Sequence, residues 1–129
     1  MSASFGPLVP VLRIFDETRA REFYVGYLGF AVEFEHRFGE NFPLYLSVQR
    51  GALELHLSEH SGDGSPGANV RIKTVDLAAF VAELRQKDYR YAKPGCAQQD
   101  AASGDLELTL TDPFGNRLTF WEDAPESSA

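Results

Sequence analysis

The segment LELHLSEH, residues 53–60, carries two carboxylates and two histidines. Side chains alternate between the two faces of an extended strand, so Glu54, His56, Ser58 and His60 share one face while the leucines take the other. Carboxylates and imidazoles bind divalent metals, and they also hydrogen-bond polar small molecules. The segment therefore supports two hypotheses, a metal site and a recognition surface.

The metal hypothesis depends on further ligands. A catalytic metal such as zinc is usually held by about three protein side chains. Glu54 and His56 share a strand face, and His36 or His60 would have to approach them. The chain has only 3 histidines, and a polar strand face is more commonly groove lining, but an independent metal site stays open at this point.

The composition excludes several other classes of function. A chain of 129 residues with 43% hydrophobic residues fits one globular domain. The net charge of −7 without a basic cluster argues against a nucleic-acid partner; it favours a cationic ligand, or serves only solubility. No apolar run is long enough for a membrane span, and the first residues do not resemble a signal peptide, so we expect a cytoplasmic protein. The single cysteine, Cys96, excludes an internal disulfide and is interpreted as an inert thiol.

The residues that could do chemistry lie in a pattern that occurs twice. PLVPVLRIFD reads as a strand ending at Asp16, a good N-cap, and the next segment has helical spacing up to Gly29. FAVEFEHRF, FPLYLSVQ and ALELHLSEH then read as strands. After SGDGSPG the order restarts with ANVRIKTVD, a helix capped by Asp76, YRYAKPG, LELTLTD and RLTFWE.

This repeat predicts an α+β fold made of two βαβββ modules, at about 5–60 and 67–123. We expect one domain over residues 1–123 and a frayed tail at 124–129. The two sheets should join into one curved mixed sheet with the helices outside, and its inner face should form a groove.

The paired modules, the opening VPVLRIFDETRAREFYVGYLGF and the closing TDPFGNRLTFWE resemble the vicinal-oxygen-chelate superfamily, which contains glyoxalases, dioxygenases and bleomycin-resistance proteins. VPVL, FY and LGF are most similar to the bleomycin-resistance proteins. The resemblance implies that the metal ligands of the enzymes correspond here to Val9, Glu54, Val70 and Thr119. If the alignment of this strand with the family is shifted by two residues, His56 takes the ligand position in place of Glu54. Because one potential ligand remains, we expect no metal and no other cofactor.

The same resemblance implies a function. Bleomycin-resistance proteins are metal-free homodimers that sequester a cationic glycopeptide drug in grooves between subunits, and they exchange the first strand about a proline that Pro10 matches. We therefore expect a small-molecule ligand similar to bleomycin, a homodimer and no catalysis. Two alternatives stay open: a glyoxalase- or dioxygenase-like metalloenzyme, and a binding module for another small molecule.

The resemblance departs at one position, because Ser103 stands where those proteins commonly carry a tryptophan that stacks on the drug. Trp121 is expected to take this role, although it could equally be a core or edge aromatic, and Phe34 and Phe38 could belong to an ordinary buried strand face. The predicted ligand-binding residues are Phe34, Phe38, Tyr45, Glu54, His56, Ser58, His60 and Trp121.

Overall fold

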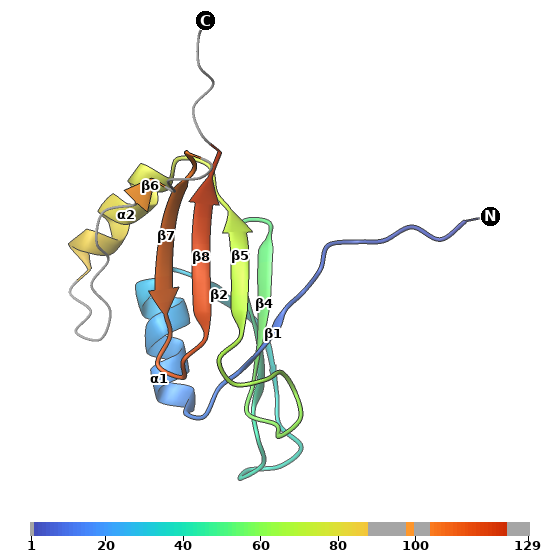
Figure 1. Ribbon diagram of the computed structural model, residues 1–129. Helices are drawn as coiled ribbons and strands as arrows, with labels where there is room; N and C mark the ends of the chain where they lie inside the picture. The colour runs from blue at the N-terminus through green and yellow to red at the C-terminus, as the bar shows by residue number, and fades with distance from the viewer. Residues whose placement is uncertain (1, 88–97, 100–103, 124–129) are drawn as a thin grey trace, which may run out of the picture.

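The computed structural model describes residues 2–87, 98–99 and 104–123. The order of elements is strand, helix and three strands, twice over, and it confirms the predicted α+β class (Figure 1). The first half contains β1 (Val11–Arg13), α1 (Glu17–Arg21), η1 (Glu22–Tyr27), β2 (Ala31–His36), β3 (Tyr45–Arg50) and β4 (Leu53–Ser58). The second half contains β5 (Asn69–Lys73), α2 (Leu77–Gln86), β6 (Gln98–Gln99), β7 (Leu106–Thr111) and β8 (Arg117–Glu122).

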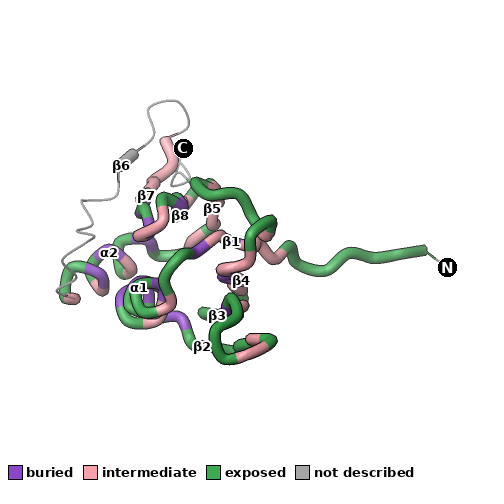
Figure 2. The backbone as a smooth tube through the Cα atoms, turned by 90° about the horizontal axis from the view of Figure 1, so that it is seen from below, coloured by how far each residue is buried: buried purple, intermediate pink, exposed green. Residues whose placement is uncertain are grey.

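The strands pair into two four-stranded mixed sheets, one from each half of the chain. Their orders are β1-β4-β3-β2 and β5-β8-β7-β6, and in each sheet the first pair is parallel and the others are antiparallel. Seen from below, the strands follow one arc in which β1 and β5 are neighbours (Figure 2). The internal repeat in the sequence is therefore a repeat of sheet topology.

The first helical segment forms where the sequence predicted it. Asp16 caps α1 by accepting a hydrogen bond from the backbone N–H of Arg19 at 2.9 Å. The helix widens into the π-helical η1, in which the N–H of Leu28 donates to the carbonyl of Phe23. Gly29, at φ 78°, ends the segment in the left-handed conformation that glycine adopts without strain.

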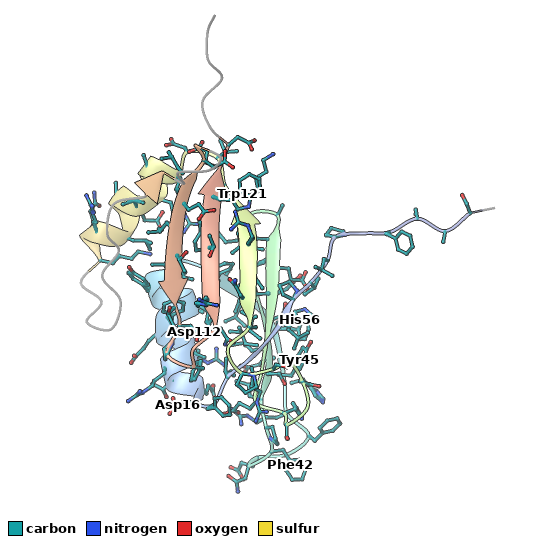
Figure 3. All side chains as sticks on the ribbon, in the orientation of Figure 1. Asp16, Phe42, Tyr45, His56, Asp112 and Trp121 are labelled. Atoms are coloured by element: carbon teal, nitrogen blue, oxygen red, sulfur yellow. The ribbon has the colours of Figure 1, made fainter. Side chains whose placement is uncertain are left out.

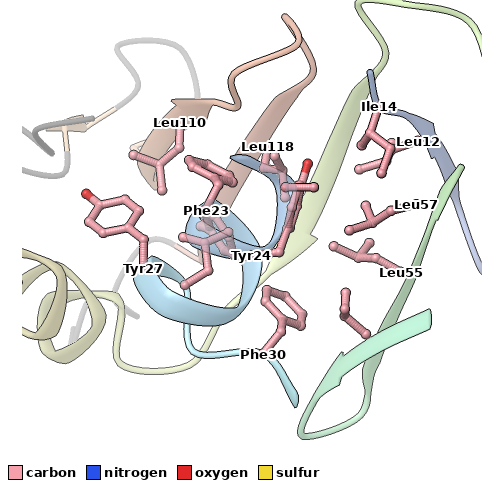
Figure 4. Close-up of a cluster of buried hydrophobic side chains, with 14 of the residues drawn as sticks. Leu12, Ile14, Phe23, Tyr24, Tyr27, Phe30, Leu55, Leu57, Leu110 and Leu118 are labelled. Carbon is pink, nitrogen blue, oxygen red and sulfur yellow. The ribbon is translucent and has the colours of Figure 1, made fainter. Parts of the chain in front are cut away.

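The hydrophobic core lies between the two sheets and around this helical segment (Figure 4). Phe23, Tyr24 and Tyr27 are fully or almost fully buried. They lie between leucines of the first sheet and leucines of the second. The predicted polar groove on the inner face of the curve is wrong for one chain, because this face holds the core. The polar strand faces are consequently directed outward.

A buried polar cluster joins the two halves at the DPFGN turn. The hydroxyl of Tyr24 donates to Asp112 Oδ2 at 2.6 Å, and Asn116 Nδ2 donates to the same oxygen at 2.8 Å. Asn116 also donates to the carbonyl of Arg13 in β1, at 2.8 Å. Burial, followed by the charge of Asp112, raises the pKa of Tyr24 well above its ordinary value, so the hydroxyl remains a donor. The turn motif is thus a structural link between the modules.

Among the described residues, no helix is long and apolar enough to cross a membrane. The predicted frayed tail at 124–129, the predicted strand YRYAKPG, Cys96 and Ser103 lie outside the described residues.

Replacing Asp112 by alanine should lower the free energy of unfolding by about 3 to 4 kcal/mol, because it leaves the buried donors of Tyr24 and Asn116 without an acceptor. Tyr24→Phe removes one donor together with its need for a partner, so it should cost about 1 to 2 kcal/mol. Urea unfolding of both variants measures this order. Equal losses would show that the carboxylate does not organise the cluster.

Candidate functional site

Three predicted site residues form a hydrogen-bonded line across β3 and β4. The Tyr45 hydroxyl lies 2.6 Å from His56 Nδ1, and His56 Nε2 lies 2.6 Å from Glu54 Oε2. Both ring nitrogens of His56 are therefore engaged, and the imidazole has a fixed orientation. Burial raises the pKa of Tyr45, and the charges of Asp63 and Glu54 raise it further, so Tyr45 stays neutral.

Phe34 of β2 covers this line. Its ring is nearly parallel to that of Tyr45, with the centroids 6.4 Å apart, and is edge-on to His56 at 5.6 Å. A register shift between Val32 and Phe34 places Phe34 opposite Ser47, on the same face as Tyr45. Phe34 is 45% exposed. It therefore offers an open aromatic surface, and the buried-face interpretation of this residue is wrong.

A second aromatic group stands beside the first. Phe38 is 74% exposed and meets the ring of His36 edge-on at 4.7 Å and that of His60 at 6.3 Å. His36 is the register partner of Tyr45, so the two groups adjoin on the sheet. The structure thus brings Phe38 and His60 next to the line of Tyr45.

Ser58 has a different position from the one expected. It is fully buried, and its hydroxyl donates to Asp63 at 2.9 Å and accepts from the backbone N–H of His60 at 3.0 Å. Ser58 therefore holds the segment after β4 in place, and its side chain is not open to a ligand in this chain.

Trp121 lies apart from the other predicted residues, on β8 of the second sheet (Figure 3). Arg71 and Lys73 of β5 flank its ring, with their charged groups 5.7 and 5.4 Å from the centroid. The predicted site residues thus fall into two groups on different sheets.

The two polar faces carry opposite charge. On the first sheet and the segment after it, Glu33, Glu54 and Asp63 contribute three negative charges and Arg13 one positive charge, which gives −2. On the second sheet and the residue after it, Arg71, Lys73 and Arg117 contribute three positive charges, and Glu107 and Asp123 contribute two negative charges, which gives +1. This basic face was not predicted, although the alternation of side chains in ANVRIK and NRLTFW indicates it.

One projected metal position is wrong. Val70 pairs with Leu118 and packs on the core, whereas Arg71 is the residue that faces outward opposite Thr119. The hydroxyl of Thr119 is hydrogen-bonded to that of Thr109, at 3.0 Å. Among the described residues, no group of three or more His, Cys, Asp or Glu could hold a metal ion.

Residues 2–126 match a family model described as glyoxalase superfamily protein. The chain belongs to the glyoxalase superfamily. A search of curated proteins finds no match.

Several solved structures share the fold. A bleomycin-binding protein complexed with bleomycin is 22% identical, with 92% of this chain and 99% of that chain covered and a TM-score of 0.70. A bleomycin-binding protein from bleomycin-producing Streptomyces verticillus, complexed with copper(II)-bleomycin, is 27% identical, with coverage of 97% and 100% and a TM-score of 0.68. A glyoxalase family protein from Enterococcus faecalis is 18% identical, with coverage of 92% and 97% and a TM-score of 0.66.

The hydrogen-bonded line predicts the tautomer of His56. An ionised carboxylate only accepts, so neutral His56 must carry its proton on Nε2 toward Glu54 and accept the Tyr45 hydroxyl at Nδ1. Nitrogen-15 NMR of the histidine side chains should show this form, and Glu54→Gln should weaken the preference. A neutral ring protonated on Nδ1 would contradict the geometry.

Proposed function

We propose that the protein is a metal-independent binding protein of the bleomycin-resistance type, which sequesters a cationic small molecule carrying planar rings and does not transform it. The proposal rests on the outward face of the first sheet. This face has a net negative charge and carries exposed aromatic rings next to hydrogen-bond acceptors. The similar bleomycin-binding proteins support the choice of bleomycin as the first ligand to test.

The acceptors on this face are arranged for a cation. With the His56 proton on Nε2 toward Glu54, the Tyr45 hydroxyl donates a hydrogen bond to Nδ1, which leaves the lone pairs of its oxygen for a ligand N–H. Glu54 contributes a carboxylate beside the same imidazole. The exposed ring of Phe34 can stack on a planar group, and such aromatic contacts contribute about 0.5 to 1.5 kcal/mol each.

A second copy of the chain supplies the opposite wall in our proposal. The outward face of the first sheet is net negative and that of the second is net positive, so the first face of one chain and the second face of its partner are complementary in charge. A two-fold dimer makes this contact twice. Trp121 from the partner would then stand opposite Tyr45 and Phe34.

The N-terminal arm supports the same dimer. Residues 2–8 are exposed and extend away from the body of the chain (Figure 1), with Phe5 96% and Leu8 92% exposed. After Pro10, β1 remains paired with β4 of its own chain. The exchanged segment is therefore proposed to be the arm before Pro10, and β1 itself is not exchanged.

The metalloenzyme alternative is the weaker one. Glu54 and His56 are hydrogen-bonded to each other, while Val9 and Thr119, at the other family positions, supply no strong ligand. Elemental analysis of gently purified protein separates the alternatives. A stoichiometric transition metal would favour the enzyme over the binding protein.

Metal-free bleomycin should change the fluorescence of Trp121, the one tryptophan of the chain, with saturable binding at or below the micromolar range. Phe34→Ala and Glu54→Gln should each weaken binding about tenfold, because each removes one stacking or charged contact worth about 1 to 2 kcal/mol. Ala78→Ser, on an exposed helical position of the second half, is the control. No binding at tens of micromolar would remove the drug assignment.

Removal of residues 2–9 should shift the protein from dimer to monomer in sedimentation velocity at micromolar concentration. The arm exposes Phe5 and Leu8, whose burial on a partner would stabilise the dimer by about 2 kcal/mol or more for each side chain. The double variant Phe5→Ser/Leu8→Ser tests the side chains without shortening the chain. A full-length protein that sediments as a monomer would contradict the shared groove.

A further inference from the structure

A cavity of about 650 Å³ lies between the two halves of the chain, and none of the predicted site residues lines it. One wall is the β3–β4 turn with Arg50 and Leu53, and the other is formed by α2 and the segment before it. This volume is within the range of about 300 to 1,000 Å³ that is typical of small-molecule sites.

The inside of the cavity is apolar and aromatic. Leu28, Phe30 and Phe120 are buried, and Ile72 and Phe80 are partly buried against the core. The rings of Phe80 and Phe120 lie 4.8 Å apart at an angle of 54°. The cavity is thus an opening of the hydrophobic core toward the surface.

The charged residues of the lining compensate one another. Arg50 and Lys73 contribute two positive charges, and Asp76 and Glu83 two negative charges, which sum to zero. Arg50 binds both carboxylate oxygens of Glu83, at 2.7 and 2.8 Å. Its guanidinium also lies over the Phe80 ring, 5.2 Å from the centroid. A ligand in this cavity meets no unbalanced charge.

The remaining polar groups are also engaged within the chain. Lys73 pairs with Asp123 at 3.1 Å, and Asp76 accepts the backbone N–H of Ala79 at 3.2 Å. An ionic ligand would have to break one of these contacts, whereas an uncharged one would not. Val75, 90% exposed on the segment that lines the cavity, adds apolar surface that a bound molecule can cover.

We infer that this cavity is a second binding site, separate from the outward face of the first sheet, and that it takes an uncharged aromatic molecule. Three phenylalanine rings provide stacking or edge contacts, and the balanced lining selects against ions.

The probe for this site is N-phenyl-1-naphthylamine, a neutral compound that becomes fluorescent in apolar surroundings. Fluorescence titration of the full chain should show saturable binding of one probe per chain. Ala79→Trp places an indole in the cavity and should weaken binding at least tenfold. Ala78→Trp is the matched control, because Ala78 is exposed on the same helix and does not line the cavity.

Two further variants complete the test. One shows where the probe binds, and the other is used if Ala79→Trp does not fold. Phe34→Ala alters the outward face of the first sheet and should leave probe binding unchanged. Val75→Trp obstructs the cavity from an exposed position, and it replaces Ala79→Trp if that variant loses its cooperative thermal transition. The inference is overturned if no saturable binding occurs, if Ala78→Trp and Ala79→Trp have equal effects, or if Phe34→Ala abolishes binding. Bleomycin binding does not enter this test, so the proposed function and the second site can fail independently.

Discussion

The packing of α1 and η1 between the two sheets determines the rest of the structure. Phe23, Tyr24 and Tyr27 are buried among leucines from both halves of the chain. This burial is the dominant stabilising contribution, and the hydrogen bonds of Asp112 orient the two halves around it. Because the core occupies the inner side of the arc, the polar side chains of both sheets face outward.

The candidate site residues lie on these outward faces, in one group on each sheet. On the first sheet, a β-bulge and the fixed imidazole of His56 collect aromatic rings and acceptors on one surface. On the second sheet, Trp121 lies between two cationic side chains. A ligand enclosed by both surfaces would need a second chain, and we propose that the exposed arm before Pro10 holds that chain.

Much of the fold could be predicted because its signals are local. Asp16 caps the first helix, Gly29 ends the helical segment, and the alternation in residues 53–60 indicates a strand. Each of these signals depends only on residues that are close in the sequence. The shared face of Glu54 and His56 followed from the same alternation. These elements need no knowledge of distant contacts.

Other features depend on contacts that a sequence does not state. The bulge before Phe34 changes which residues of β2 share a face with Tyr45, and the parallel pairing of β5 with β8 places Arg71, not Val70, opposite Thr119. Which side of the sheets α1 covers depends on its contacts with both halves of the chain. The groove was predicted on the wrong side because these contacts cannot be seen in the sequence.

We propose that one binding site combines the first sheet of one chain with the second sheet of another. Mixed dimers test it most directly: one chain carries Glu54→Gln and His56→Ala, its partner carries Trp121→Phe, and ligand binding is measured by calorimetry. Neither parent dimer should bind appreciably, and each mixed dimer should recover one intact groove. If binding does not recover on mixing while both parents are impaired, the site lies within a single chain.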